Sequence, residues 1–328
     1  MKHLTIVLAL AGLAVSALLV AWFDAGQVLD VVLSVGWRGF ALLSLWQAGL
    51  FVMLGLAWSI VLPGVGRGVL VWGRMVRDAA TTCLPFSPVG GYVLGARAIT
   101  VRGVAWPTAA AGTVVDVTAE LIGQFCFSVF GLLALLLLRP GSPLLAPVGI
   151  TLALAGLLVT LIWRLRTAIG HGLRALGERL LGQWFTMQNQ GQGRGPAGLG
   201  RVGTELTRLY GEPRRLLLAS TLHLLGWFST GIGTWISLRL LGWDTGLLSI
   251  VALEALLDAL VAAAFIVPGA AGVQEAGYVG LGAAFGVPPD MALGVSLLRR
   301  ARDLALGVPI LLVFQWIELR RLRLPHRA

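Results

Sequence analysis

The sequence has little charge, few cysteines and few histidines, and each shortage excludes a class of protein. Only 12% of its 328 residues are charged, about half the fraction of a soluble domain, so a water-soluble globular protein is excluded. The two cysteines, Cys83 and Cys126, lack the spacing of metal ligands, and we interpret them as small apolar residues. The four histidines are scattered, which argues against a metal site. His223, inside an apolar run, is expected to be a packing residue.

Motifs of common enzyme classes are also missing. The sequence contains no Gly-x-Ser-x-Gly nucleophile elbow, no His-Glu-x-x-His pair, no Walker loop and no dinucleotide fingerprint. We therefore expect neither an enzyme nor a cofactor. Without an ATP site, any transport would be passive, coupled to an ion or driven by a partner protein.

Long apolar runs are abundant instead. The hydrophobic fraction is 57% with a mean hydropathy of +0.86, and several runs reach the roughly 20 residues that a helix needs to span a bilayer. The sequence predicts one integral membrane domain over residues 1–328, an all-α polytopic bundle of about eight crossings. The first run continues to Phe23, past an Ala-Val-Ser-Ala that resembles a cleavage site, so we expect an uncleaved span.

The expected helices differ in length and regularity. Membrane spans are expected at residues 40–62, 106–138, 144–163, 216–240, 246–267 and 290–319, the last with a kink at Pro309. Residues 267–287 are expected to traverse most of the bilayer as a further, broken crossing. Residues 66–105 carry five arginines and Pro and Gly breaks. They are expected to form two short helices folded into the membrane edge.

The charges indicate topology. The net charge of +10 comes from arginines that lie between apolar runs, which fits cytoplasmic loops and anionic lipid headgroups better than nucleic acid. Residues 164–215 are expected to be a basic cytoplasmic loop, with an amphipathic helix near 164–185 and a flexible Gly- and Gln-rich centre at 188–196. Both termini are expected in the cytoplasm.

Two passages of the sequence, residues 85–107 and 268–289, resemble each other. Each has a Pro-containing break, then Gly-Tyr-Val, small residues, Gly-Val and a proline. Broken segments at matching places in two halves are typical of transporters, whose binding sites lie at such breaks. Chance is the alternative, because Gly and Pro are common in membrane helices. The residues expected to form the breaks are Pro85, Gly90, Gly91, Pro268, Gly269 and Gly272.

Charged residues inside the apolar runs predict a polar interior. Asp116 and Glu120 are four residues apart and share a helical face, as do Glu254 and Asp258. Each charge facing lipid would cost roughly 2.5–3.5 kcal/mol, so these side chains should point inward. The residues expected to contact a cargo are Arg97, Asp116, Glu120, Glu254, Asp258, Glu275, Arg299, Arg302 and Asp303.

Ion pairing is expected among these residues. Arg299 is placed to pair with Asp303 on its own helix, which leaves Arg302 to reach an acid elsewhere, namely Asp116, Glu120 or Glu254. The alternative is that the charges only hold helices together. Glu275 follows a break, where it either meets a cation or headgroup or accepts hydrogen bonds from freed backbone N–H groups.

These same segments resemble a known family. The segments are Pro85-Phe-Ser-Pro-Val-Gly-Gly-Tyr-Val-Leu-Gly-Ala-Arg97, Val115-Asp-x-x-x-Glu120, Val267-Pro-Gly-Ala-Ala-Gly-Val-Gln-Glu275 and Leu298-Arg-Arg-Ala-Arg-Asp303. They resemble the flippase-like transmembrane domain of lysylphosphatidylglycerol synthases, and most closely the hopanoid-biosynthesis-associated HpnL branch. The similarity covers roughly residues 38–319. It implies a helical domain with re-entrant segments in a bacterial inner membrane. The resemblance covers the translocating half of such synthases and not their soluble aminoacyl-transferase domain.

The resemblance and the residues together predict lipid translocation between leaflets, with phospholipid or hopanoid cargo. Arginines would hold a phosphate, and carboxylates a cationic headgroup or hydroxyls. Two alternatives stay open. An intramembrane enzyme would alter the lipid chemically, with Asp116 and Glu120 as acid and base. A scaffold for lipid-synthesis proteins would tolerate loss of these carboxylates.

Overall fold

The computed structural model describes residues 25–84, 87–154, 156, 157, 164, 196–263 and 272–323. This part of the chain forms helices joined by loops and contains no strand, so the expected all-helical membrane bundle is confirmed. The labelled helices are α2 (Ala25–Val61), α3 (Arg67–Cys83), α4 (Ser87–Val101), α5 (Trp106–Leu138), α7 (Pro196–Tyr210), α8 (Pro213–Leu240), α9 (Leu247–Ala263), α10 (Val273–Ala284) and α11 (Pro289–Arg323). A further apolar helix covers Leu145–Leu154.

Three of the described helices are long and apolar enough to cross a membrane: Leu33–Val61 in α2, Trp106–Leu138 and Pro213–Leu240. The 33 residues of α5 extend about 50 Å, more than the roughly 30 Å of a hydrocarbon core, so a tilted crossing fits best. The span expected at 1–23 lies outside the described residues, as do residues 155 and 158–163 of the span expected at 144–163. Residues 165–195, which hold nearly all of the expected amphipathic helix and the Gly- and Gln-rich centre, also lie outside them. The count of eight crossings therefore stays a prediction.

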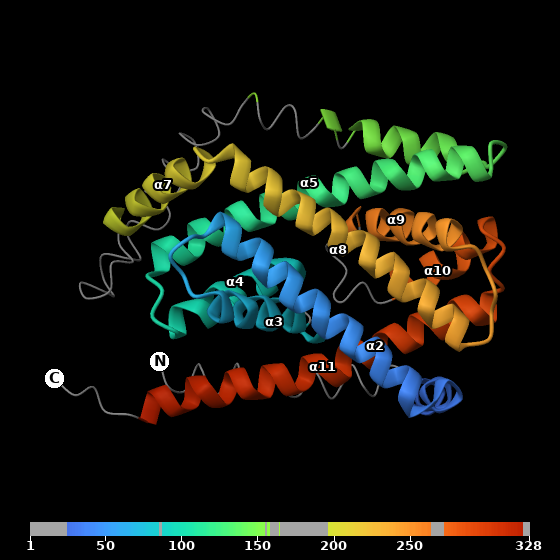
Figure 1. The fold of residues 1–328 in the computed structure, drawn as a ribbon, viewed down its shortest axis with the longest axis horizontal. Coiled ribbons are helices and arrows are strands. Elements are labelled where there is room, and N and C mark those ends of the chain that lie inside the picture. The colour runs from blue at the N-terminus through green and yellow to red at the C-terminus, as the bar shows by residue number, and fades with distance from the viewer. Residues whose placement is uncertain are drawn as a thin grey trace.

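Two units of four helices repeat the same order of long, short, short and long. The first unit is α2 to α5, and the second is α8 to α11. In Figure 1, α2 and α8 run in opposite directions, and so do α5 and α11, so that a half-turn about the viewing direction exchanges the units.

The packing between helices follows the same symmetry. The contacts α2–α3, α5–α9 and α5–α8 have counterparts in α8–α9, α11–α3 and α11–α2. The pairs α3–α4, α4–α5 and α2–α5 correspond to α9–α10, α10–α11 and α8–α11. The two units therefore form an inverted repeat, which the similarity of residues 85–107 and 268–289 anticipates.

The turns that follow the short helices are the same in both units. Gly103 and Gly286 have φ angles of 95° and 79°, a left-handed conformation that glycine adopts without strain. In each turn the next residue bonds back to the end of the short helix, Val104 N to Ile99 O and Val287 N to Gly282 O. Each glycine stands three residues before the next long helix. The shared Gly-Val of the sequence thus sets the exit angle into α5 and α11.

The glycines expected in breaks behave in different ways. Gly90 and Gly91 lie in the first turns of α4 and not in a break, because the chain is already helical from Ser87. A Cβ at Gly91 would overlap Thr81 and the Arg77 carbonyl, so Gly91 allows α4 to approach α3 closely. Gly272 precedes α10 with a φ of 77°. Pro85, Pro268 and Gly269 lie outside the described residues.

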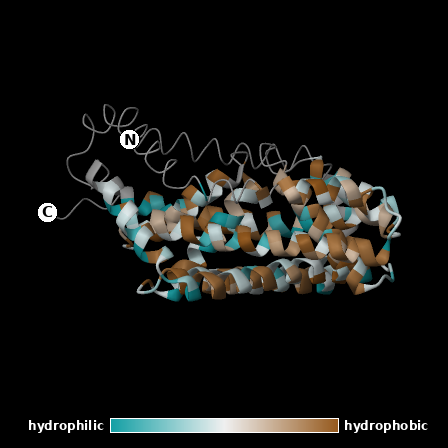
Figure 2. Cartoon of the chain, turned by 90° about the horizontal axis from the view of Figure 1, so that it is seen from above, coloured by the Kyte–Doolittle hydropathy of each residue, from teal (hydrophilic) through white to brown (hydrophobic). Residues whose placement is uncertain are grey.

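The outside of the bundle suits a lipid environment. Figure 2 shows hydrophobic residues over most of the helix surfaces, with hydrophilic residues recurring midway along the bundle and near its ends. Trp37, near the start of α2, lies beneath Arg38, and Trp316, near the end of α11, beneath Arg320, at 5.4 and 3.7 Å. These helix ends lie at opposite ends of the molecule (Figure 1), as expected of aromatic anchors at two membrane interfaces.

Candidate functional site

A cavity of about 590 Å³ lies where the two units meet, and residues of α2, α3, α4, α5, α8, α9, α10 and α11 line it. Most of its polar lining is charged. The charged and histidine residues that line it are Arg74, Arg77, Asp78, Glu120, His223, Asp258, Arg299, Arg300, Arg302 and Asp303. So many charges around one space in a hydrophobic bundle are the strongest indication of a functional site.

The first unit contributes an ion cluster between α3 and α5. Arg77 donates to Asp116 at 2.7 Å and also binds Glu120. Arg74 donates to Glu120 at 2.9 Å and to Asp78 at 2.8 Å. Asp116 is fully buried, and the two arginines are nearly so. The spacing of four between Asp116 and Glu120 places both carboxylates opposite the arginines of α3.

His223 of α8 extends this cluster. Its Nε2 lies 3.1 Å from Asp116 Oδ1, and because a carboxylate only accepts hydrogen bonds, we assign the proton to Nε2. Nδ1 is then an acceptor, and it has no hydrogen-bond partner among the described residues. His223 is buried, as expected of a packing residue, and in addition it binds Asp116 and lines the cavity.

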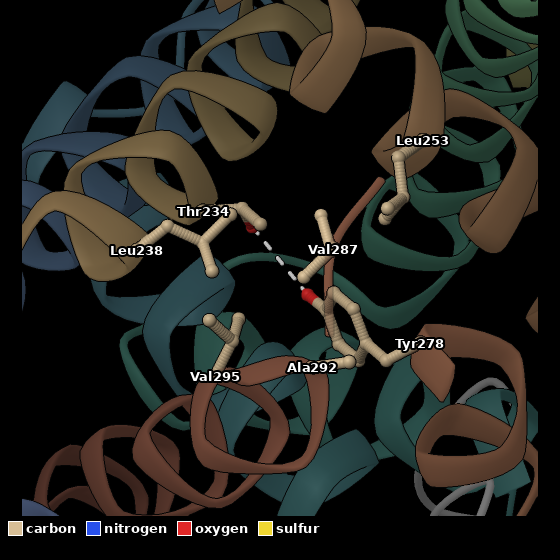
Figure 3. A pocket seen from close by; sticks show the side chains of 7 residues that line it. All are labelled: Thr234, Leu238, Leu253, Tyr278, Val287, Ala292 and Val295. Carbon is tan, nitrogen blue, oxygen red and sulfur yellow. Dashed lines mark hydrogen bonds between the residues drawn. The ribbon is translucent and has the colours of Figure 1, made fainter. Parts of the chain in front are cut away.

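The second unit contributes an ion cluster between α9 and α11. Arg299 binds Glu254 and lies 3.8 Å from Asp258. The hydroxyls of Tyr278 and Thr234 donate to the same Glu254 oxygen at 2.9 and 2.8 Å. In Figure 3 these two hydroxyl side chains point toward each other beside a small cavity of about 10 Å³ with otherwise apolar walls. Both oxygens of the buried Glu254 carboxylate thus have donors, whereas Asp258 Oδ2 has no partner among the described residues.

The two clusters occupy equivalent positions with opposite signs. Arg74 is the eighth residue of α3, and Glu254 is the eighth residue of α9. Asp116 and Arg299 are each the eleventh residue of their helices, α5 and α11. The ion pair between a short and a long helix is thus kept in both units, but its acid and base have changed places.

This exchange of signs segregates charge across the cavity. The repeat packs α3 against α11 and α5 against α9. All five cavity arginines come from α3 and α11, which we call the arginine wall, although each of these helices also carries one cavity carboxylate, Asp78 or Asp303. Helices α5 and α9 carry only carboxylates (Asp116, Glu120, Glu254 and Asp258), which we call the carboxylate wall. Such a cavity can hold a group with a negative part and a hydrogen-bond-donating part at the same time.

The structure brings most residues expected at the site together but pairs them differently. Arg299 binds Glu254 and not Asp303, and Arg302 binds its neighbour Asp303 at 2.7 Å instead of reaching another helix. Arg97 lies apart from the cavity, where it forms a two-bond ion pair with Glu318.

Glu275 is held by protein groups. It accepts from the Gly272 backbone N–H at 2.8 Å and from Arg300 at 3.0 Å. This arrangement matches the second of the two roles considered for it, which is to satisfy backbone donors at a helix start. It also ties the beginning of α10 to α11.

Arg74 and Arg77 are the main residues that sequence reasoning misplaced. They were grouped with loop arginines at the cytoplasmic surface, but they are buried and bind the acids of α5. A usable signal is their spacing of three, which places both side chains on one face of the short helix expected there. Two tyrosines of the site, Tyr92 and Tyr278, are indicated in the sequence only by their place in the repeated Gly-Tyr-Val. The ring of Tyr92 lies 4.3 Å from the Arg77 guanidinium.

The fold and the site define a class: a polytopic helical membrane protein with an inverted repeat and a charged cavity between its halves. No three His, Cys, Asp or Glu side chains gather as metal ligands in the described part of the chain. The chain belongs to the family described as the lysylphosphatidylglycerol synthase TM region, whose family model matches residues 9–310. No curated protein and no solved structure matches it.

Proposed function

We propose that this protein translocates lipids between the two leaflets, with the headgroup passing through the cavity while the acyl chains stay in the bilayer. The observation that carries the proposal is the cavity with its arginine and carboxylate walls, placed between inverted repeats. Transporters bind their cargo at such repeat interfaces, near the middle of the membrane. Family membership supports a function connected with membrane lipids.

A phospholipid headgroup fits this charge distribution best. Its phosphate would lie against the arginine wall, since guanidinium groups bind phosphate through paired hydrogen bonds. An ammonium or hydroxyl group would lie against Asp258 and the Nδ1 of His223, the acceptors without partners in the described residues. A hopanoid, the cargo that the HpnL resemblance suggests, would use only the second set of contacts.

The setting of this activity is part of the proposal. The protein would work in a bacterial inner membrane with both termini in the cytoplasm. Its partners would be membrane lipids and lipid-synthesis proteins, without nucleic acid, and no catalytic step would be involved.

The test is leaflet exchange of labelled phospholipid and labelled hopanoid in vesicles that contain the purified protein. Asp116→Asn/Glu120→Gln removes the carboxylates that bind both α3 arginines. We expect its exchange rate to fall at least about tenfold, since each charge-assisted hydrogen bond is worth roughly 1.5–3 kcal/mol. Glu205→Gln/Arg208→Gln, an exposed ion pair on α7, is the control and should exchange lipid normally.

Three results would contradict the proposal. Absence of exchange for both lipids in a folded wild type would favour a scaffold. Equal exchange by the cavity variant would remove the cavity from the path. Chemically altered lipid in the vesicles would favour an intramembrane enzyme.

A further inference from the structure

Each half of the cavity is one positive charge short. In the first unit, two arginines (Arg74, Arg77) face three carboxylates (Asp78, Asp116, Glu120). In the second unit, three arginines (Arg299, Arg300, Arg302) face four carboxylates (Glu254, Asp258, Glu275, Asp303). The described residues around the cavity thus leave two negative charges uncompensated, one in each unit.

Each half also has one buried acceptor with no partner among the described residues. Beside the ion cluster of the first unit it is Nδ1 of His223, which belongs to α8 and binds Asp116 through its other nitrogen; beside the cluster of the second unit it is Oδ2 of Asp258. Both residues line the cavity and are 1% and 6% exposed. A missing charge and an acceptor without a described partner therefore occur together at each of the two clusters, although both acceptors belong to helices of the second unit, α8 and α9.

The contacts of both residues involve several helices. His223 binds Asp116 of α5, and Glu120 lies one turn further along that helix. Asp258 lies one turn from Glu254 on its own helix and 3.8 Å from Arg299 of α11, and its backbone oxygen accepts from Gln124 of α5. The other charged and neutral polar groups that share the cavity with them are given by its lining, which includes Gln47 of α2 and Gln274 of α10. Among the described residues, the cation paired with Asp258 is Arg299, which is shared with Glu254.

A buried excess of negative charge in a membrane is costly unless something neutralises it. An imidazole nitrogen and a carboxylate oxygen both bind protons, whereas hard metal cations prefer several oxygen ligands, which neither position gathers among the described residues. We propose that protons on His223 and Asp258 neutralise the empty cavity and that a cationic headgroup displaces them.

The second half of this proposal rests on the proposed function, and it gives translocation an energy source. Each bound proton would leave to the water on the side to which the cavity is open, while the headgroup amine keeps its own proton and no covalent bond to carbon changes. Headgroup and protons would then move in opposite directions, so a proton gradient would drive lipid exchange.

The first experiment measures proton binding without any cargo. The purified protein in phosphatidylglycerol nanodiscs is titrated between about pH 5 and 8, where exposed carboxylates stay ionised. We expect wild type to bind about one proton more than Asp258→Asn, while Asp258→Glu keeps that proton. The exposed Asp244 provides the control, since Asp244→Asn should titrate like wild type. Identical titrations for wild type and Asp258→Asn would overturn the proposal whatever the cargo is.

The second experiment adds dihexanoyl phosphatidylethanolamine, whose amine stays protonated, and records proton release with a pH indicator in unbuffered solution. Wild type should release protons, His223→Gln and Asp258→Asn each about half as many, and the double variant none. Dihexanoyl phosphatidylglycerol, which lacks the amine, should release none. Binding of phosphatidylethanolamine without release would overturn the exchange of charges but leave lipid translocation intact. A failed leaflet-exchange assay would instead reject the function and leave the titration result standing.

Discussion

The side chains that bind Glu254 show how this protein keeps charge inside a membrane. The carboxylate is fully buried and accepts from Arg299, Tyr278 and Thr234, which belong to three different helices. Each of the two carboxylate oxygens thus has at least one donor. A buried ion pair contributes little net stability, but a broken one leaves a charge without compensation.

Arg299→Gln should therefore destabilise the protein strongly, by about 3–5 kcal/mol, because Glu254 stays behind unpaired. Arg299→Gln/Glu254→Gln should regain much of this loss, since neither charge is then buried. Denaturant unfolding in nanodiscs measures both. The exposed pair Arg239–Asp244 supplies the control, as Arg239→Gln should cost at most about 1 kcal/mol. Equal losses for the single and double variants would show that Arg299 acts through packing alone.

At the scale of the element, two helix crossings depend on glycine. A Cβ on Gly131 would lie 2.7 Å from the Ala255 Cβ, where α5 crosses α9. A Cβ on Gly307 would lie 2.5 Å from the Cys83 Sγ, where α11 crosses α3. These are the symmetry-related contacts that bring the two carboxylate-bearing helices together and the two arginine-bearing helices together. The close approach of backbones there determines how wide the cavity is.

Gly131→Ala should consequently destabilise the protein by about 1–3 kcal/mol, since the added methyl overfills the crossing. In α2, a methyl group added at Gly49 would meet nothing within 4 Å. Gly49→Ala should be neutral or stabilise the helix by up to about 1 kcal/mol. Thermal unfolding of the two variants side by side checks this. If Gly131→Ala unfolded at the same temperature as wild type, α5 and α9 would be able to separate slightly without loss of stability.

The helices themselves are largely predictable from the sequence. The length of an apolar run predicts the length of a helix, and Pro and Gly residues predict where it ends, and both depend only on local residues. Residues 106–138 were expected as one helix, and α5 covers that range. Two short helices were expected within 66–105, and α3 and α4 lie there. The pairing of charges was not predictable, because it depends on the angle at which α3 crosses α5. The sequence therefore predicts Arg74 and Arg77 at the membrane surface, whereas they bind buried acids of α5. It also predicts a partner on another helix for Arg302, which binds its neighbour Asp303.

At the scale of the whole molecule, the inverted repeat makes a prediction about sidedness. Gly66 directly precedes α3, and Gly246 directly precedes α9. A Cβ added at either glycine would have as its nearest neighbour a side-chain atom of the residue three positions on, at 3.8 Å in both cases. Since the units are inverted, these equivalent positions should face opposite sides of the membrane.

Cysteine labelling in sealed vesicles measures this directly. In a background without Cys83 and Cys126, Gly66→Cys and Gly246→Cys should react with a membrane-impermeant maleimide from opposite sides. The two positions are matched in their surroundings, so each serves as the control for the other. Reaction of both from the same side would contradict the inverted repeat.

The exchange of signs between equivalent positions has an evolutionary consequence. A four-helix unit that worked as a homodimer would carry the same residue at both equivalent places, so each wall of its cavity would mix arginines with carboxylates. Only two distinct copies of the unit can carry Arg74 and Asp116 in one and Glu254 and Arg299 at the equivalent positions of the other. A cavity whose arginines all lie on one side is therefore a property that two diverged units can acquire and a symmetric homodimer cannot.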